Sequence, residues 1–404
     1  MNRATDPKSI AAQAAPAAGN ASANGILTVD LGAIAANWKK LEGKGVPAEC
    51  AGVVKADAYG CGLAPVTKTL SDAGCKTFFV ATLDEARTVR ATAPTAKIYV
   101  LDGLFSGTGD QFAAINCMPV IGDMGELAEW DAFRSTAGWL GTAAIHIDTG
   151  MNRLGLSIGE AQGLAPRMKT VNPGFSLVMS HLACAETLGH PMNARQVAAF
   201  REIASLFSGV SASLSNSSGI FLGPHFLFDM IRPGAALYGV NPTPEADNPM
   251  QQVIDLKARI VQVRHVAKGE TIGYGATWTA RRDTRVAVAA TGYADGYFRA
   301  ASGVDGTRSA EAIVAGQRCP IAGRISMDLT AIDVTDVTAP VRRGHMATLI
   351  GDGITVDELG HHFGTIGYEV LTSLGPRYAR VYKDAPASAE PPKAMDQPAP
   401  QTGD

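Results

Sequence analysis

Alternation of short apolar runs with longer amphipathic stretches is the feature that most constrains the fold of this chain. Eight apolar runs follow one another in the first 218 residues, from ILTVDL and AGVVKAD to FSLVMSHLA and SASLSNSS. The segments between them, such as LAPVTKTLSDAGC and HPMNARQVAAFREIASLF, carry apolar residues at helical spacing. Repeated strand–helix units predict a parallel sheet, and eight of them predict an α/β fold of the (β/α)8 TIM barrel type.

A doubly wound sheet is the alternative fold for such a pattern. No GxGxxG or GxxxxGK[ST] sequence opens a helix after a strand, which favours the barrel. From about Asp255 onward, strand-like runs such as KARIVQVRHV and RVAVAATGY follow without long helices between them and predict a mostly-β domain. We therefore expect a disordered leader over residues 1–25, the barrel over 26–250, a β-rich C-terminal domain over 251–382 and a disordered tail over 383–404.

Length, net charge and cysteine spacing exclude several classes of function. A length of 404 residues suits two domains, and a net charge of −3 with a pI near 6.3 argues against a nucleic-acid partner. Residues 1–25 contain no uninterrupted apolar segment long enough for a signal peptide or a membrane span. The six cysteines form no CxxC pair, which is typical of reduced thiols and not of a metal site. We expect a cytoplasmic protein without metal, nucleic-acid or membrane partners.

Polar residues directly follow several of the apolar runs, where the strands of a barrel deliver functional side chains. They are Lys55, Asp102, Asp148, His181 and Asn216. Taken alone, Lys55 is more typical of a solvated lysine at a strand end. In a partly desolvated site its pKa would fall, and it could form a Schiff base with a carbonyl group.

The segment around Lys55, VVKADAYGCG, resembles the cofactor-lysine motif of the alanine racemases, which are barrel-type enzymes dependent on pyridoxal 5'-phosphate. Seven further segments resemble motifs of that family in the same order: DTGMNRLG, SHLA, NSSG, IRPGAALYG, GYGATW, GYADG and GRISMDLTAIDVT. The resemblance extends from about Ile26 to Tyr382. It implies an isomerase that interconverts L-alanine and D-alanine, with the cofactor as electron sink.

The resemblance also implies the catalytic roles. Lys55 would carry the cofactor and act as the base toward D-alanine, and Tyr274 would be the base toward L-alanine. His181 and Arg232 would support the Tyr274 phenolate, and Arg232 would also face the pyridine nitrogen.

The remaining positions of the resemblance concern binding and assembly. The implied cofactor-binding residues are Lys55, Tyr59, His181, Asn216, Ser217, Arg232, Gly234 and Ala235. Arg153, Met327 and Tyr293 are the implied substrate-binding residues. The active enzyme would be a homodimer in which Tyr274 and Met327 reach the barrel of the partner chain.

Two positions depart from the family pattern. Many members have a lysine, often carbamylated, where this chain has His146, so we expect that an anion or another side chain steadies Arg153 and that activity does not depend on bicarbonate. The family's additional phosphate-side tyrosine has no clear match, because Pro376 stands at that place. Tyr378 and Tyr382 are both candidates to replace it.

Other functions fit parts of the sequence. GLSIG satisfies the GxSxG pattern of serine hydrolases, but Ser157 does not directly follow a strand, and with Glu160 it matches a helix capping box. A non-enzymatic pyridoxal-phosphate carrier would lack the β-rich domain, and a related decarboxylase suits the opposed Lys55 and Tyr274 less well than a racemase. Turnover of alanine alone, of serine as well, or of a broader set all agree with the sequence, as do biosynthetic and degradative use of D-alanine.

Overall fold

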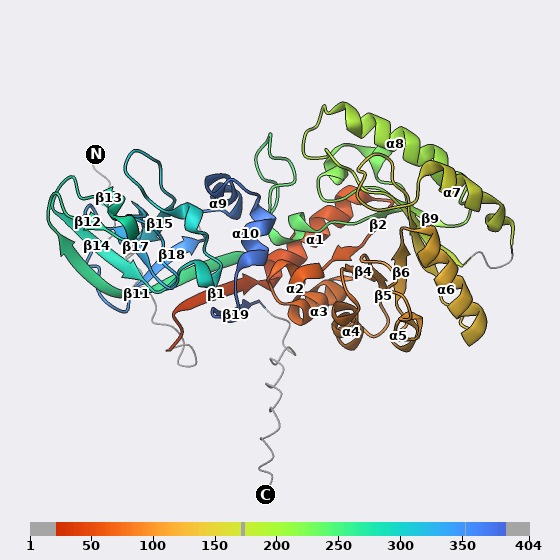
Figure 1. Cartoon of the computed structure of the whole chain (residues 1–404), viewed down its shortest axis with the longest axis horizontal. Helices are drawn as coiled ribbons and strands as arrows, with labels where there is room; N and C mark the ends of the chain where they lie inside the picture. Colours follow the sequence, from red (N-terminus) through yellow and green to blue (C-terminus); the bar gives the residue numbers. More distant parts are fainter. Residues whose placement is uncertain (1–21, 171–173, 352, 385–404) are drawn as a thin grey trace, which may run out of the picture.

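The protein consists of a barrel domain and a sheet domain that lie side by side along its long axis (Figure 1). The computed structural model describes residues 22–170, 174–351 and 353–384. The expected leader over 1–25 and tail over 383–404 lie almost wholly outside these residues. Among the described residues, no helix has the length and apolar character needed to cross a membrane.

Parallel strands form the centre of the N-terminal domain. The sheet runs in the order β3-β4-β5-β6-β7-β8-β9, and each neighbouring pair is parallel. Its strands are β3 (Gly52–Val53), β4 (Thr77–Val80), β5 (Lys97–Val100), β6 (Met118–Ile121), β7 (Ala143–His146), β8 (Phe175–Met179) and β9 (Ser211–Ser213).

A short eighth strand closes the barrel. β10 (Met230–Ile231) pairs in parallel with β2 (Glu49–Cys50), which directly precedes β3. On one side of β10 the Ala51 amide donates to the Ile231 carbonyl at 3.0 Å, and on the other the Arg232 amide donates to the Ser215 carbonyl at 3.0 Å. The first apolar run, ILTVDL, had been expected to supply this eighth strand, and that assignment is wrong.

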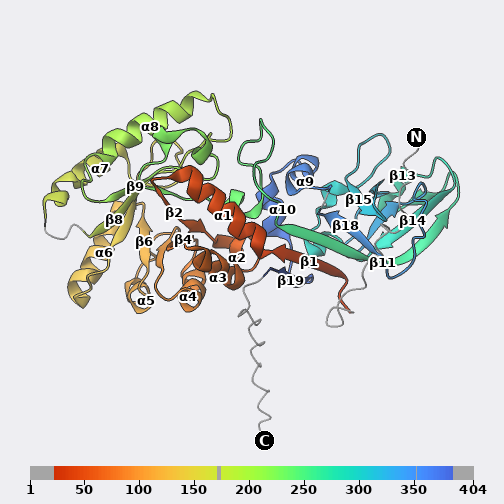
Figure 2. The same ribbon diagram turned by 180° about the vertical axis from the view of Figure 1, so that it is seen from behind.

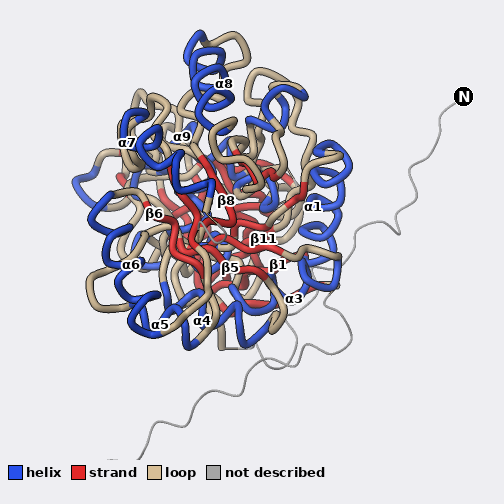
Figure 3. The backbone as a smooth tube through the Cα atoms, turned by 90° about the vertical axis from the view of Figure 1, so that its right-hand side faces the viewer, coloured by secondary structure: helices blue, strands red, loops and turns tan. Residues whose placement is uncertain are grey.

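Helices surround these strands, as the view along the long axis shows (Figure 3). Side chains alternate along each strand, so that Phe79 lies in the small cluster inside the barrel and Phe78 packs outward against the helices. The helices are α1 (Leu31–Gly45), α3 (Leu63–Ala73), α4 (Leu83–Thr92), α5 (Gly109–Ala114), α6 (Met124–Ala137), α7 (Ile158–Leu164) and α8 (Pro191–Ala204). The short α2 (Lys55–Tyr59) directly follows β3.

The C-terminal domain is mostly β. Its strands are β11 (Ile254–Val266), β12 (Thr271–Ile272), β13 (Trp278–Thr279), β14 (Thr284–Ala289), β15 (Glu311–Val314), β16 (Gln317–Pro320), β17 (Thr330–Asp333), β18 (Met346–Ile350) and β19 (Ala379–Lys383). Two helices, α9 (Val356–Phe363) and α10 (Gly367–Ser373), lie beside the barrel domain (Figure 1). The predicted fold class, a barrel followed by a mostly-β domain, is confirmed.

The first strand of the chain belongs to the C-terminal sheet. β1 (Gly25–Asp30), which contains most of the ILTVDL run, pairs antiparallel with β11 and parallel with β19. Figure 2 shows β1 beside β11, away from the barrel strands. Its alternating burial, with Leu27 and Val29 buried, suits a strand in the interior of a sheet. The predicted domain boundaries stay predictions.

Candidate active site

A cavity of about 590 Å³ lies at the carboxyl ends of the barrel strands. Lys55, Asp102 and His181 each stand two residues beyond a barrel strand and line this cavity. The cavity also contains the other site residues predicted in the barrel domain: Tyr59, Arg153, Asn216, Ser217, Arg232, Gly234 and Ala235. Parallel strands bring residues that are far apart in sequence to one edge, which explains why they meet here.

Lys55 is the amine of this cavity. Burial lowers its pKa below the ordinary 10.5, and the nearby Arg153 guanidinium lowers it further, while Asp102 and Glu85 oppose the shift. A lysine with a lowered pKa presents more of its neutral amine at neutral pH, which is the form that attacks a carbonyl group or accepts a proton.

One end of the cavity is lined with hydrogen-bond donors. The Ser217 hydroxyl oxygen accepts from the amides of Gly234, at 3.0 Å, and Ala236, at 3.1 Å, so its own proton is left to donate. Burial raises the pKa of Tyr59 to about 12, so its phenol keeps its proton. A Cβ on Gly234 would overlap the Tyr59 hydroxyl, and glycine is therefore required at this close approach.

The base of the cavity holds a buried arginine. Arg232 donates to the carbonyl oxygens of Ser180, at 2.6 Å, and Leu214, at 3.5 Å, and to the Ser213 hydroxyl. Burial lowers its pKa to about 9, and none of the acidic side chains within the described ranges forms a salt bridge with it. A buried guanidinium without a carboxylate partner suits a group with a neutral acceptor atom.

Two histidines beside this arginine are neutral at physiological pH. Burial lowers the pKa of His181 to about 3, with smaller contributions from the Arg232 and Arg153 charges. For the same causes, in the same order, the pKa of His146 falls to about 4. The positive charges at the cavity are therefore those of the arginines and of protonated Lys55.

Three predicted site residues lie outside this cavity. Tyr274, Tyr293 and Met327 are in the C-terminal domain, where their exposed fractions are 69%, 44% and 54%. The amide of Tyr293 donates to Ser326 and that of Ala294 donates to Met327, at 3.1 and 3.0 Å, so the loops carrying Tyr293 and Met327 are joined. Within one chain, the structure does not bring these residues to Lys55.

The structure adds one tyrosine that the sequence interpretation did not include. Tyr368 of α10 lines the cavity, and its hydroxyl donates to Glu186. The hydroxyl groups of Tyr378 and Thr291, in contrast, form a hydrogen bond at 2.7 Å. Neither Tyr378 nor Tyr382 lines the cavity. The buried residues Gly367, Val370 and Leu371 give α10 an apolar face, but Tyr368 lies off that face, so the apolar pattern did not point to it.

Ser157 has a structural role. It is the N-cap of α7, its hydroxyl oxygen accepts from the Glu160 amide at 3.3 Å, and the Glu160 carboxylate accepts from the Ser157 amide at 2.8 Å. This is the predicted capping box. In the described part of the chain, no cluster of three or more His, Cys, Asp or Glu side chains could hold a metal ion.

Comparison with known proteins identifies the family. Residues 29–242 match the family model for the alanine racemase N-terminal domain, and residues 253–382 match that for the C-terminal domain. An alanine racemase of Methylobacterium nodulans is 51% identical over 357 residues, covering 88% of this chain and 95% of that protein. A biosynthetic alanine racemase of Agrobacterium fabrum is 45% identical over 366 residues, covering 88% and 93%.

A solved structure agrees with the sequence comparisons. The alanine racemase of Bartonella henselae, with covalently bound pyridoxal phosphate, superimposes with a TM-score of 0.84 at 35% identity, covering 89% of this chain and all of that one. The predicted family, enzyme class and cofactor are thereby confirmed. The chain belongs to the alanine racemase family of pyridoxal-phosphate-dependent isomerases.

Proposed function

We propose that the chain racemises alanine with two bases, Lys55 on one face of the substrate and Tyr274 from a second copy of the chain on the other. The observation that carries this proposal is the desolvated Lys55 amine in a cavity lined with donors. Tyr274 is exposed and free to meet another barrel.

The cavity fits pyridoxal phosphate. Ser217, Tyr59 and the backbone amide of Ala235 offer donors for the phosphate, and Gly234 leaves room for it. Tyr368 adds a further phenol to the same cavity. When bound, the cofactor supplies an electron sink for the negative charge that develops at the α-carbon of alanine.

Arg232 would orient the cofactor, and Arg153 would orient the substrate. Arg232 would donate a hydrogen bond to the ring nitrogen without delivering its proton, which keeps negative charge from spreading far into the ring and limits side reactions. Arg153 lines the cavity, forms no ion pair within the described ranges, and would bind the substrate carboxylate. Met327 and Tyr293 of the second copy would border the same carboxylate.

The two bases would work in turn. The neutral Lys55 amine takes the α-proton from D-alanine, and the Tyr274 phenolate takes it from L-alanine; the conjugate acid of the opposite base then returns a proton. A phenol has an ordinary pKa near 10, so the phenolate needs a nearby positive charge. His181 is neutral, and we propose that it relays the stabilisation from the buried Arg232 charge.

A covalent-labelling experiment tests the role of Lys55. Borohydride treatment of the holoenzyme should fix the cofactor on the peptide that contains Lys55, as mass spectrometry of a digest would reveal. Lys55→Ala should lose both this label and the visible absorbance of bound cofactor, because no other lysine lines the cavity in the described structure. A label on another lysine, or undiminished absorbance in the variant, would contradict the assignment.

The physiological role concerns the use that the cell makes of D-alanine. Relatives of this chain carry both "biosynthetic" and "catabolic" in their names, and we propose that this enzyme either supplies D-alanine for peptidoglycan or degrades it. Complementation of a D-alanine auxotroph, compared with growth on D-alanine as carbon source, separates the two roles. The six cysteines, all free, support a cytoplasmic location.

A further inference from the structure

The turn that follows Lys55 is left-handed. Ala56, Asp57, Ala58 and Tyr59 have φ angles of 54°, 53°, 53° and 55°, so α2 is a single left-handed turn built from four consecutive residues other than glycine. L-amino acids avoid this conformation, because it brings Cβ too close to the following carbonyl oxygen. The surrounding structure must therefore hold the turn in place.

The carboxylate of Glu85 stabilises the start of this turn. Glu85 Oε1 accepts from the amides of Ala56, at 2.6 Å, and Asp57, at 3.4 Å. Its other oxygen, Oε2, accepts from the amides of Ala81, at 2.8 Å, and Thr82, at 3.3 Å. Glu85 thus joins the first two residues after Lys55 to the start of α4, whose Thr82 capping box includes Glu85 itself.

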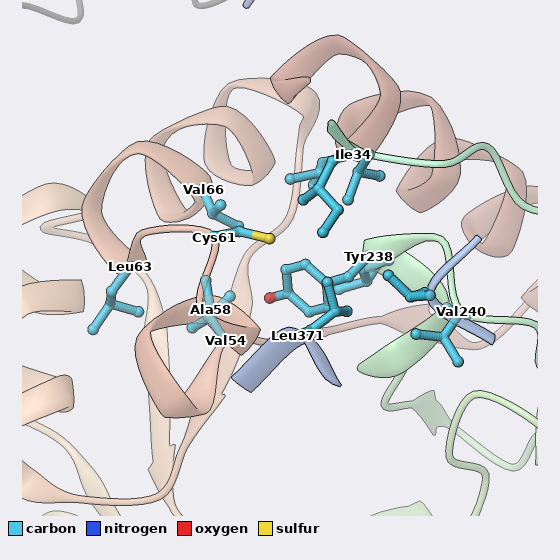
Figure 4. Packing of buried hydrophobic residues seen from close by; sticks show 14 of the residues in the cluster. Ile34, Val54, Ala58, Cys61, Leu63, Val66, Tyr238, Val240 and Leu371 are labelled. Carbon is cyan, nitrogen blue, oxygen red and sulfur yellow. The ribbon is translucent and has the colours of Figure 1, made fainter. Parts of the chain in front are cut away.

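The far end of the turn is anchored by packing. Ala58 is fully buried, and its amide donates to the Val54 carbonyl at 2.9 Å. Figure 4 shows Val54 and Ala58 close to Leu371 of α10 and to the ring of Tyr238. Ala56 and Asp57 are exposed, so at the end next to the lysine the contact with Glu85 takes the place of packing.

The barrel unit formed by β6 and α6, two units beyond that of Glu85, provides an internal comparison. Glu126 has the same third position in α6, where Oε2 accepts from the Gly122 amide at 2.8 Å and Oε1 from the Leu104 amide at 3.3 Å. This carboxylate also ties a preceding strand end to its helix. Glu85 and Glu126 therefore make the same kind of contacts with backbone amides. Only Glu85 contacts the turn that follows the cavity lysine, Lys55.

We propose that Glu85 is a positioning residue, whose carboxylate holds the left-handed turn after Lys55 and thereby fixes where the lysine amine points in the cavity. The proposal rests on the proposed function, in which Lys55 is the base for one face only. The Glu85 charge also raises the pKa of Lys55, against the larger lowering by burial and by Arg153. Removal of this charge should therefore lower the pKa of the amine further.

Face-specific exchange tests the proposal. In deuterated water, Glu85→Gln holoenzyme should lose about 10-fold to 100-fold in α-hydrogen exchange from D-alanine, the loss typical of a misplaced catalytic group. Exchange from L-alanine should change much less, because the base on that face is untouched. The pH at which D-alanine exchange rises should also move down, because the amine is less basic.

Two further variants make the result decisive. Glu126→Gln removes the matching carboxylate and should leave both exchange rates at their wild-type values. Glu85→Asp keeps the charge but withdraws the oxygens by one methylene, so D-alanine exchange should fall without the pH shift. Unchanged exchange from D-alanine in Glu85→Gln, or losses matched by Glu126→Gln, would overturn the proposal. A Glu85→Gln chain that fails to fold leaves the decision to Glu85→Asp.

A measurement without substrate separates the role proposed for Glu85 from the two-base hypothesis. The pH dependence of the visible absorbance of the Lys55-bound cofactor reports the lysine environment whatever base acts on L-alanine. We expect this dependence to shift in Glu85→Gln and not in Glu126→Gln. If Tyr274→Phe slows exchange from both enantiomers while the Glu85→Gln shift persists, the two-base hypothesis fails and the role of Glu85 stands. An unshifted titration in Glu85→Gln would count against Glu85.

Discussion

Lys55 and Tyr274 differ in every local property that matters for a base. Lys55 is partly buried in a cavity, and its lowered pKa makes the neutral amine available. Tyr274 is exposed on a short turn between β12 and β13 of the C-terminal domain, away from the cavity that Lys55 lines. In the proposed mechanism, Tyr274 would lie against Arg232 and His181 of a second copy of the chain.

Tyr274→Phe tests this division of labour. The substitution removes one phenolic oxygen and leaves Lys55 untouched, so folding and cofactor attachment should survive. In deuterated water the variant should still exchange the α-hydrogen of D-alanine, while exchange from L-alanine and net racemisation should fall by about 10² to 10⁴, the contribution of a general base. Equal residual exchange from the two enantiomers would show that Tyr274 does not serve one face.

The buried histidines predict how stability depends on pH. In the unfolded chain His146 and His181 bind protons near the ordinary pKa of 6.5, whereas in the folded protein they do so only near pH 4 and pH 3. Between these limits the unfolded state holds more protons, so stability falls as the pH decreases from about 6.5 toward 4. The slope reaches about 1.4 kcal/mol per pH unit for each histidine.

Urea unfolding at a series of pH values measures this slope. His146→Asn removes one of the two groups, so the variant should lose less stability than the wild type on acidification over the same range. Substitution of the exposed His225 to Asn serves as the control, and the slope should not change. Identical slopes for the wild type and His146→Asn would contradict the prediction.

At the scale of elements, the βα alternation predicted most of the barrel correctly, because each buried strand leaves an apolar run. It failed for β1 and β10. The ILTVDL run has the alternation of any half-buried strand, and alternation does not say which sheet the strand joins. β10 is only two residues long, Met230–Ile231, and such a strand leaves no periodic pattern in the sequence.

The candidate site shows the same limit. Residues at strand ends were predictable, because a barrel places them together whatever the details of its loops. Tyr368 was missed, because its place at the cavity depends on how α10 docks against the barrel domain and not on its own segment. The left-handed turn at Ala56–Tyr59 was equally hidden, since four residues other than glycine carry no local signal for that conformation.

At the scale of the whole molecule, the two halves of the proposed site lie on different domains. The cavity belongs to the barrel, and Tyr274, Met327 and Tyr293 lie exposed on the C-terminal domain. A two-fold pair of chains would join each barrel to the C-terminal domain of the other copy and produce two equal sites.

Mixing two inactive variants tests this assembly. Lys55→Ala and Tyr274→Phe chains, unfolded together and refolded in equal amounts with cofactor, should pair at random. Each mixed dimer then has one site with both native residues, so about one quarter of the wild-type number of sites should be active. If Tyr274 served its own barrel, no mixed dimer would regain activity. Sedimentation of the wild-type enzyme should show two chains per particle.

The position of β1 in the C-terminal sheet means that it is synthesised long before the strands that pair with it. β1 is made before the barrel strands, whereas its partners, residues 254–258 and 379–383, are made after them. Until these partners are made, both edges of β1 lack the strands that cover them in the folded protein. Unpaired edges are where chains aggregate and where quality control recognises them. A nascent chain released before residues 379–383 are made would therefore keep one edge of β1 without its partner.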